Sequence, residues 1–563
     1  MRRAPFLGVL ALLAWPAWCS ASHTIVPDNY AAVPAAIASG ADTVLIRDGS
    51  FLDPISIPRA LALAPMAPIS SQLPLPYPTL GPITIDVPTP GAGMVSVKHM
   101  RVTGPVTWNA SQFRPDLVSF EDCRLDAGLT TTPTTAIVGL RLYGCVIRGE
   151  VFAAVYYPDV VGCTFLQCGL QVQSNGAVSI RDNYFQGPAA WGIRACCSDA
   201  SWNVSHNYIT GTTVGIWASA GTFTANEVHD TQSAACEADG ASGNVTFQNN
   251  VVVHAGGNGI DLSSPGSPAR SHAAFNNLIE DAAGDGIHST TLSWVRGNTV
   301  LRSGDDGIEI TSGYACNANT VLNSTHRGIV VNSSGGAADS NVVGRSGADG
   351  MAIAGVDEAL QNTSYLNGGN GFTVTGASVP VHNNIGYGNI GYGVSCSATG
   401  SAALGCNDWY GNTAGSSRVC APVGTDLTVL PGFCNLPLDD VHLSGSSPLL
   451  NAPGCGLIGA LPQGCGAAAA VAPPPNPISS PRVSPLPAQR AVHFSWDPYQ
   501  RVDRVEVYDV LGSRVRTLAP GAVRGEIEWD GSDDAGRLVP AGVYHARFVA
   551  PNGARAVRVV FVR

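Results

Sequence analysis

The sequence predicts an all-β protein in which a right-handed parallel β-helix is followed by a small β-sandwich. Two observations predict the solenoid. First, a short motif recurs: an asparagine followed by an apolar residue, and then, nine positions after the asparagine, a glycine followed by another apolar residue. The motif returns about every 21 or 22 residues, and such a period is typical of solenoids. The segments inside each period are short, β-branched and alternating, as strands are. The sandwich is predicted by residues 489–563, which are rich in arginine and alternate strictly.

The recurring asparagine is expected to form a column inside the solenoid. Successive coils stack at about 4.8 Å, so equal positions can hydrogen-bond along the axis. Cysteines hold the equivalent place in earlier coils, where a buried thiol can replace an amide. The glycine of each repeat is expected to mark a turn with positive φ. The column comprises Cys123, Cys145, Cys163, Asn183, Asn207, Asn226, Asn250, Asn277, Asn298, Asn319, Asn341, Asn362 and Asn384.

Residues 1–21 have the pattern of a signal peptide, because Arg2 and Arg3 precede an apolar stretch and then small residues. No later apolar run reaches the roughly 20 residues of a membrane span. We therefore expect a secreted or cell-surface protein with no transmembrane segment in the mature chain. Charged residues make up only 13% of the chain and the net charge is −11, which argues against a nucleic-acid-binding protein.

The solenoid is predicted over residues 22–465. An amphipathic helix at Val33–Ser39 and a strand at Thr43–Arg47 would cap its first coil, because an open end exposes core and strand edges. Coils are expected to be irregular from about Val95 and regular over 180–412. The capping segment resembles the N-terminal cap of secreted pectin-lyase-like β-helix proteins. The phrases SSPLLN and IGA resemble their closing segment.

Six cysteines crowd the end of the repeats: Cys396, Cys406, Cys420, Cys434, Cys455 and Cys465. In an exported protein these predict disulfides that close the irregular end, with the pairing left open. The column of Cys123, Cys145 and Cys163 could equally stay reduced.

An Ala/Pro-rich linker is predicted at 466–488, before the sandwich at 489–563. The phrases VEVYDVLGSRVRTL and WDGSDDAGRLVPAGVYHARF resemble the FlgD-type immunoglobulin-like domain, and also the C-terminal sorting domains of some secreted bacterial enzymes. The resemblance implies a bacterial protein whose last domain engages export or cell-surface machinery and carries no catalytic residue.

Two columns of the solenoid carry charge in the same middle coils. The first lies just before each repeat glycine. The second lies two residues beyond that glycine and should face outward. The first reads Trp191, Val214, Ala234, Asn258, Asp285, Asp306, Arg327, Asp349, Asn370 and Tyr392. The second reads Arg194, Trp217, Glu237, Asp261, His288, Glu309, Val330, Ala352, Thr373 and Ser395.

These columns predict acid/base chemistry on a sugar. Neighbouring carboxylates raise one another's pKa, so one can hold a proton while another stays ionised. Distances of about 5–9 Å between two carboxyl groups cover both the retaining and the inverting route of glycoside hydrolysis. The candidate catalytic residues are Asp261, Asp285, Asp305, Asp306, His288, Glu309 and Arg327. The candidate substrate-binding residues are Trp191, Arg194, Trp217 and Glu237.

The phrases GDGI at 284–287 and GDDGIEI at 304–310 resemble the aspartate motifs of polygalacturonase-type hydrolases. The resemblance implies Asp285, Asp305 and Asp306 as the acid and the water-activating carboxylates. The chain departs from that pattern in the next coil, where Arg327 stands in the place of a histidine and His326 lies one position early.

The predicted function is cleavage of an acidic polysaccharide, by hydrolysis before elimination and without a cofactor. A lyase would use Arg194 or Arg327 as its base and calcium to neutralise a uronate. The alternative is a non-catalytic glycan-binding or adhesive surface protein, because Asp or Asn before a turn glycine is also ordinary turn chemistry.

Overall fold

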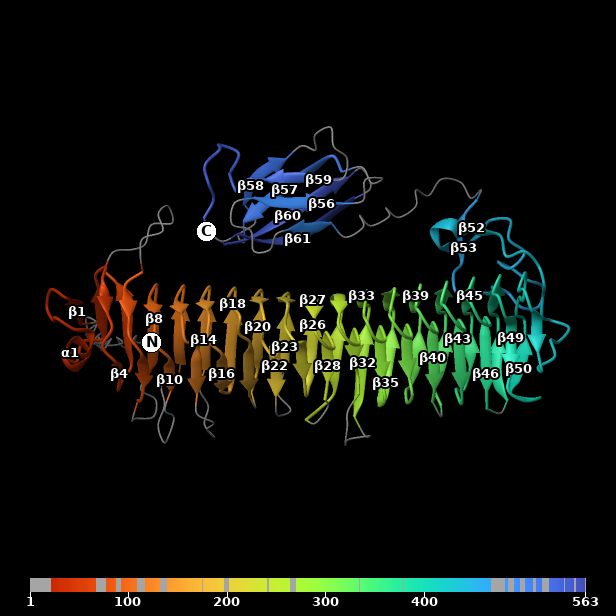
Figure 1. The fold of residues 1–563 in the computed structure, drawn as a ribbon, viewed down its shortest axis with the longest axis horizontal. Coiled ribbons are helices and arrows are strands. Elements are labelled where there is room, and N and C mark those ends of the chain that lie inside the picture. The colour runs from red at the N-terminus through yellow and green to blue at the C-terminus, as the bar shows by residue number, and fades with distance from the viewer. Residues whose placement is uncertain are drawn as a thin grey trace, which may run out of the picture.

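The computed structural model describes residues 22–66, 77–87, 93–108, 117–131, 139–174, 176–196, 202–239, 242–263, 270–333, 335–376, 378–466, 481–484, 491–496, 502–509, 513–518, 526–540, 542–550 and 553–561. Within these ranges the fold is a right-handed parallel β-helix with a small β-sandwich beside it (Figure 1). None of the helices described is long and apolar enough to cross a membrane. The predicted signal peptide lies outside the described residues.

Each regular coil adds one strand to each of three parallel sheets, which we call A, B and C. Sheet A has 15 strands, from β1 (His23–Val26) to β41 (Ala337–Asp339). Sheet B has 16, from β3 (Ser50–Phe51) to β48 (Ile385–Tyr387). Sheet C includes β4 (Ile55–Ile57), β7 (Ile83–Ile85), β22 (Trp191–Cys196), β25 (Val214–Ala218), β28 (Cys236–Ala238), β31 (Ile260–Asp261), β34 (Ile287–Ser289), β37 (Ile308–Ile310), β40 (Ile329–Asn332), β43 (Met351–Ala354), β46 (Phe372–Thr375), β49 (Tyr392–Cys396) and β51 (Gly415–Arg418).

The predicted asparagine column is confirmed as a continuous hydrogen-bond ladder. From Asn183 to Asn384, each side-chain Nδ2 donates to Oδ1 of the next ladder residue at 2.9–3.1 Å. The ladder then runs through Asn407 to Asp426, again at 2.9 Å. A second, shorter ladder joins Asn367, Asn389 and Asn412. Buried amides are thereby satisfied coil by coil.

The cysteine column continues this ladder toward the N-terminus, also as predicted. Cys123, Cys145 and Cys163 are buried and free. Their thiols donate to backbone carbonyls of an earlier coil at 3.2–3.4 Å, as the Asn183 amide does to the Val160 carbonyl at 2.9 Å. The Cys163 N–H donates to Asn183 Oδ1 at 2.9 Å, which joins the two columns.

The predicted role of the repeat glycines is wrong. Gly286 and Gly307 do not have positive φ. A Cβ at Gly286 would lie 2.2 Å from Val300 Cγ1, and a Cβ at Gly307 equally close to Val321 Cγ1. Glycine is therefore needed for inward packing. Positive φ falls at the residue before each ladder asparagine, such as Asn276 at 53°, which asparagine tolerates better than most side chains.

The N-terminal cap is confirmed as α1 (Val33–Ala38), which buries Val33, Ala36 and Ile37, followed by β2 (Thr43–Ile46). Coils begin earlier than the predicted onset near Val95, because β4 already pairs with β7 in parallel. Long insertions between those early strands hide the repeat in the sequence.

The closing segment folds as a three-stranded sheet of β52 (Phe433–Asn435), β53 (Asp440–Ser444) and β54 (Gln463–Cys465), with the turn η1 (Leu436–Leu438). It packs its own apolar residues against Ile385 of sheet B. All six predicted cysteines are paired, as Cys396–Cys420, Cys406–Cys455 and Cys434–Cys465.

The C-terminal sandwich has two antiparallel sheets around buried aromatic side chains. One contains β55 (Arg482–Ser484), β56 (Val492–Ser495) and β59 (Glu526–Trp529). The other contains β57 (Arg504–Asp509), β58 (Arg514–Leu518), β60 (Gly542–Ala550) and β61 (Gly553–Phe561). The predicted start of the sandwich at 489 is too late, because β55 pairs with β56 from within the predicted linker. A three-residue strand among prolines gives little signal in a sequence.

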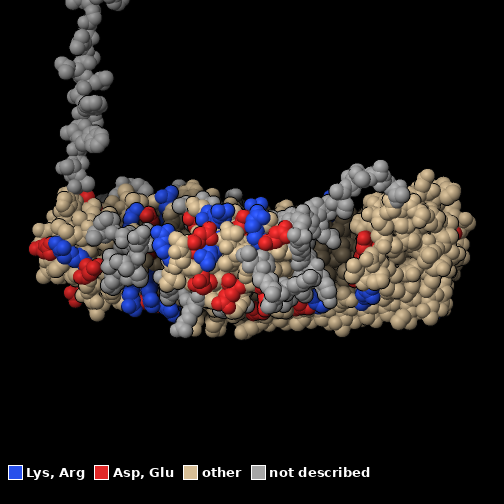
Figure 2. Space-filling model, turned by 90° about the horizontal axis from the view of Figure 1, so that it is seen from above, with Lys and Arg blue, Asp and Glu red and all other residues tan. Residues whose placement is uncertain are grey.

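The sandwich lies beside the strands of sheet B and leaves sheet C uncovered (Figure 1). The Arg558 guanidinium donates to the backbone carbonyls of Asp182, Asn183 and His206 at 2.7–3.1 Å. From the side of the sandwich, charged residues gather over the sandwich and the N-terminal coils and are sparse over the C-terminal coils (Figure 2). The charged columns discussed next lie on sheet C.

Candidate functional site on sheet C

The outward column predicted from the repeat is confirmed strand by strand. Parallel pairing places Glu237 beside Asp261, Asp261 beside His288, and His288 beside Glu309. Trp217 precedes Glu237 and Val330 follows Glu309 in the same register. The structure therefore brings the predicted polar residues into one row on the outer face of sheet C.

The column before the repeat glycines forms a second ladder, between side chains and backbone. Asn258 Oδ1 accepts the Asp285 N–H at 3.0 Å. Asp285 Oδ1 accepts the Asp306 N–H at 3.0 Å, and Asp306 Oδ1 accepts the Arg327 N–H at 2.8 Å. Each aspartate thus uses one oxygen to hold the next coil, as turn chemistry predicts. The other oxygen remains available to side chains.

Asp285, His288 and Glu309 form the centre of the site. His288 Nδ1 lies 3.9 Å from Asp285 Oδ2, and His288 Nε2 lies 3.9 Å from Glu309 Oε2. The Asp285 side chain is 9% exposed, while those of His288 and Glu309 are 26% and 28% exposed. The imidazole therefore stands between a buried carboxylate and one that reaches solvent.

The environment of Asp285 disfavours its charge. Burial, with the nearby Glu309 carboxylate as the next cause, raises the pKa of Asp285 to about 6. Burial and the Asp261 carboxylate likewise raise the pKa of Glu237. A carboxyl that keeps its proton up to about pH 6, beside a second carboxyl, is an arrangement suited to acid/base catalysis.

Asp306 has opposite surroundings, although it repeats Asp285 one coil later. Arg327 Nη2 lies 2.7 Å from Asp306 Oδ2, and His326 Nδ1 lies 3.0 Å from Asp306 Oδ1. His326 also approaches the exposed Asp305 at 3.3 Å. Asp306 raises the pKa of Arg327 despite the opposing effect of burial. The structure thus divides the predicted catalytic residues into two clusters.

Asn258 is a site residue that the sequence reasoning missed. Its Nδ2 lies 3.1 Å from Asp261 Oδ2 and 3.2 Å from His288 Nδ1. Asp261 Oδ1 also accepts the Ser263 N–H at 2.9 Å. Asn258 therefore links Asp261 to the central cluster. Its place before the repeat glycine, one coil ahead of Asp285, was the available signal.

The predicted binding residues Trp191, Arg194 and Trp217 contact one another. The guanidinium carbon of Arg194 lies 4.4 Å from the centroid of the Trp191 ring and 4.8 Å from that of Trp217. Both distances are within the range of cation–π attraction. This stack lies in the coils just before Glu237, so it forms an aromatic surface next to the acidic residues of the column.

Among the described residues, two groups have the donor types and spacing to hold a divalent cation. Asp285, His288 and Glu309 each offer a ligand atom, all within 4.8 Å of one another, and so do Asp305, Asp306 and His326. The second group is less suited, because Arg327 already neutralises Asp306. Mixed imidazole and carboxylate donors fit transition metals better than calcium, which takes oxygen ligands.

Comparison with solved structures finds likenesses of low identity and low TM-score. The periplasmic alginate epimerase AlgG is 9% identical, with 52% of this chain and 77% of that chain covered and a TM-score of 0.29. The A-module of the Azotobacter vinelandii mannuronan C-5 epimerase AlgE4 is 12% identical, with 71% and 92% covered and a TM-score of 0.22. Tailspike protein 3 of bacteriophage CBA120 is 11% identical, with 71% and 60% covered and a TM-score of 0.22.

Likenesses of this degree carry no inference about activity. No curated protein matches the chain. A family model described as a right handed beta helix region matches residues 162–275 and 218–325, which include the coils that carry Trp191, Asp285 and Glu309.

Proposed function

We propose that this protein binds a polysaccharide along the outer face of sheet C and cleaves it at Asp285, His288 and Glu309. The proposal depends mainly on one observation. The His288 imidazole lies between the carboxyls of Asp285 and Glu309, and Asp285 is buried and has a pKa of about 6. The row of Trp217, Glu237 and Asp261 approaches this cluster in unbroken register and supplies contacts for a chain of sugars.

Hydrolysis fits these side chains better than elimination. Asp285 can donate a proton to the leaving oxygen, and Glu309 is the carboxyl that acts on the sugar or on water. Ligand atoms within 4.8 Å of one another are nearer to the roughly 5–5.5 Å of retaining enzymes than to the wider separation of inverting ones. The two candidate bases for elimination are engaged: Arg327 with Asp306, and Arg194 between two indole rings.

The charges of the site also bear on the substrate. Glu237, Asp261, Asp285 and Glu309 occupy neighbouring coils, and the His288 imidazole lies between Asp285 and Glu309. These carboxylates would repel an anionic sugar at short range unless a cation lay between them. We therefore propose a neutral glycan as the substrate at the centre, and an acidic polysaccharide only in the presence of a divalent cation.

The experiment is a screen of neutral and uronic-acid polysaccharides, with and without added calcium or chelator, followed by new reducing ends and by the absorbance of an unsaturated product. Glu309→Gln should lower cleavage at least about 10²-fold. The control is Asp349→Asn, which changes a carboxylate in the column before the repeat glycines, outside the cluster, and should cleave normally. Cleavage that survives Glu309→Gln would refute the assignment.

The alternative is a non-catalytic glycan-binding or adhesive surface protein. It would bind polysaccharide through the Trp191–Arg194–Trp217 stack and yield no product with any substrate. We further propose that the protein is exported through its N-terminal 21 residues and that the sandwich engages export or cell-surface machinery. The sequence resemblances support this role, and a chain lacking residues 482–563 should be mislocalised in its native host.

A further inference from the structure

Sheet A exposes a pair of stacked aromatic side chains away from the site described above. Trp294 lies on β35 (Leu292–Arg296), and Tyr314 immediately precedes β38 (Ala315–Asn317) in the next coil. Their ring centroids are 5.3 Å apart and their planes differ by 28°. Trp294 is 46% exposed and Tyr314 is 42% exposed. A single exposed apolar side chain is common on a protein surface, but two exposed aromatic rings in contact indicate a binding surface.

The indole interrupts a row of small side chains. Parallel pairing places Trp294 between Ala273 and Ala315 on neighbouring strands, and both alanines are nearly buried, at 7% and 9% exposure. Outward neighbours this small leave room for a flat ring above the sheet. Core packing does not account for Trp294, because its side chain points away from the solenoid interior.

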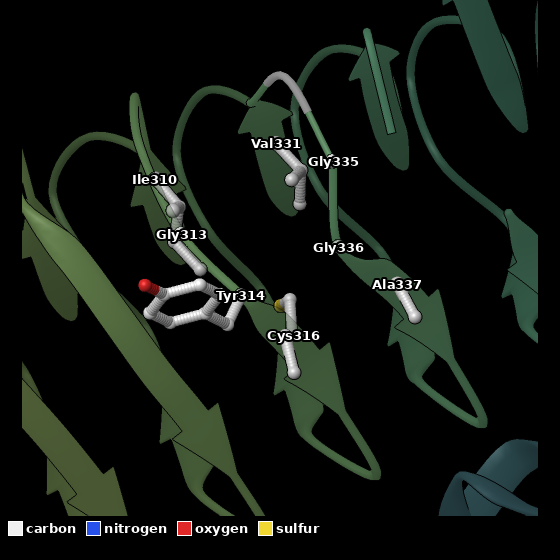
Figure 3. Close-up of a pocket in the computed structure, with 9 residues that line it drawn as sticks. Ile310, Gly313, Tyr314, Cys316, Val331, Gly335, Gly336 and Ala337 are labelled. Atoms are coloured by element: carbon white, nitrogen blue, oxygen red, sulfur yellow. The ribbon is translucent and has the colours of Figure 1, made fainter. Parts of the chain in front are cut away.

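A shallow hollow adjoins Tyr314 at the corner between sheets C and A (Figure 3). Gly313, Gly335 and Gly336 line it and contribute no side chain. A Cβ at Gly336 would lie 2.5 Å from the Tyr314 carbonyl oxygen. The corner is therefore built largely from backbone, and Tyr314 lies beside this shallow hollow.

The Tyr314 backbone is fixed from both sides. Its N–H donates to the Ser293 carbonyl at 2.9 Å, and its carbonyl accepts the Ala337 N–H at 3.2 Å. Trp294 follows Ser293 within a paired strand. The two rings are thus carried on rigid backbone, so little conformational freedom is lost when a ligand stacks on them.

The pair belongs to the same two coils as the proposed catalytic cluster. Ile310, next to Glu309 on β37, lines the hollow beside Tyr314. Trp294 follows His288 by six residues, after the chain has turned from sheet C to sheet A. A ligand that crosses this corner would meet both surfaces.

We propose that Trp294 and Tyr314 form a second sugar-binding platform, against which a pyranose ring of the same polysaccharide stacks through its C–H face. A sugar fits because it offers a flat apolar face with hydroxyls at its rim, and Arg296 and Asn317 lie in register at the edge of the pair. Two rings are far too small an area for a stable protein interface, which buries roughly 800 Å² on each partner. The proposal rests on the proposed function for the identity of the ligand.

The test measures binding of the full-length protein to immobilised xylan, mixed-linkage glucan, polygalacturonate and alginate by affinity electrophoresis. Trp294→Ala and Tyr314→Ala should each weaken binding of at least one polymer by about tenfold or more, and Trp294→Phe should weaken it less. The matched control is Tyr157→Ala on β17 (Tyr157–Val161) of the same sheet. Tyr157 is 47% exposed, but its ring is tilted by 52° from that of Tyr156 and not stacked on it.

Unchanged thermal midpoints would show that the variants fold. Binding by wild type that both platform variants retain in full would overturn the proposal, and so would the absence of binding to all four polymers. Failure of the catalytic assignment is separate from these outcomes. It would appear as cleavage that survives Glu309→Gln, whereas the platform is judged by retention alone.

Discussion

Arg327 binds the Asp306 carboxylate through two side-chain hydrogen bonds, from Nη2 to Oδ2 at 2.7 Å and from Nε to Oδ1 at 3.2 Å. One coil earlier, Asp285 occupies the same position with Glu309 nearby and, among the described residues, no arginine paired with it. Aspartates at the same position of two neighbouring coils thus differ. Arg327 neutralises the charge of Asp306, whereas burial and Glu309 disfavour the charge of Asp285. The predictions for the two aspartates differ accordingly.

Asp285→Asn should abolish cleavage and stabilise the fold above pH 6. The folded pKa of Asp285 is about 6 and the ordinary value is 3.8. Between these values the folded protein holds more protons than the unfolded chain, so the free energy of unfolding falls as pH rises. Asparagine still accepts the Asp306 N–H without carrying a charge. We expect a gain of about 1–3 kcal/mol at pH 7.5, measured by urea unfolding, and little gain at pH 4.

Asp306→Asn should instead destabilise the protein. Asparagine can keep the hydrogen bond to the Arg327 N–H, but it leaves a half-buried guanidinium without its carboxylate. The expected loss is about 1–3 kcal/mol at pH 7.5, less than for a fully buried pair because Arg327 is partly exposed. Activity should fall mainly through disorder of the neighbouring coil. Asp305→Asn, at an exposed carboxylate one residue away, is the control and should unfold as wild type does.

Asn298→Leu should lower the free energy of unfolding by about 1–3 kcal/mol. Asn298 is 1% exposed. Its amide donates to Asn319 Oδ1 and to the Ala274 carbonyl, and its Oδ1 accepts from Asn277. Leucine would strand donors and acceptors in both adjacent coils. An unchanged thermal midpoint would contradict the ladder as a source of stability.

Arg558→Ala should free the sandwich from the solenoid. The guanidinium makes three hydrogen bonds to solenoid carbonyls, and alanine would leave those oxygens without this partner. We expect a larger radius of gyration by small-angle X-ray scattering, with unfolding of the solenoid unaffected. Arg537→Ala is the control, because Arg537 pairs only within the sandwich, with Asp533 at 2.9 Å. Identical scattering from the two variants would count against docking through Arg558.

Features that depend on repeat register could be predicted from the sequence. The ladder through Asn298 and the outward row from Trp217 to Glu309 both follow from residues that recur at one coil position. The continuation to Asn407 was missed because Asp408 and Ser416 stand there in place of the repeat's apolar residue and glycine. The short ladder of Asn367, Asn389 and Asn412 was readable, since each lies five residues after a main-ladder asparagine.

Features that depend on side-chain direction or on distant segments could not be predicted. Register places Asp306 and Arg327 in one column, but not the rotamer that closes their ion pair. The glycine at 286 was assigned to turn conformation because sequence shows no contact with the valine at 300. Arg558 contacts the carbonyl of Asp182, which lies far away in the chain, so no local sequence pattern predicts this contact.

The asparagine ladder has a direction. Every side-chain-to-side-chain bond of the ladder runs the same way, because Nδ2 donates to the asparagine of the following coil and Oδ1 accepts from that of the preceding coil, so these bond dipoles add along the axis. The donor end of this row falls at Asn407, whose backbone N–H and Nδ2 both donate to a carboxylate oxygen of Asp426 at 2.9 Å. A negative charge at that end is favourable for the reason that acidic residues favour the first turn of an α-helix. The ladder is thus polar along its length, and the Asp426 carboxylate lies at its donor end.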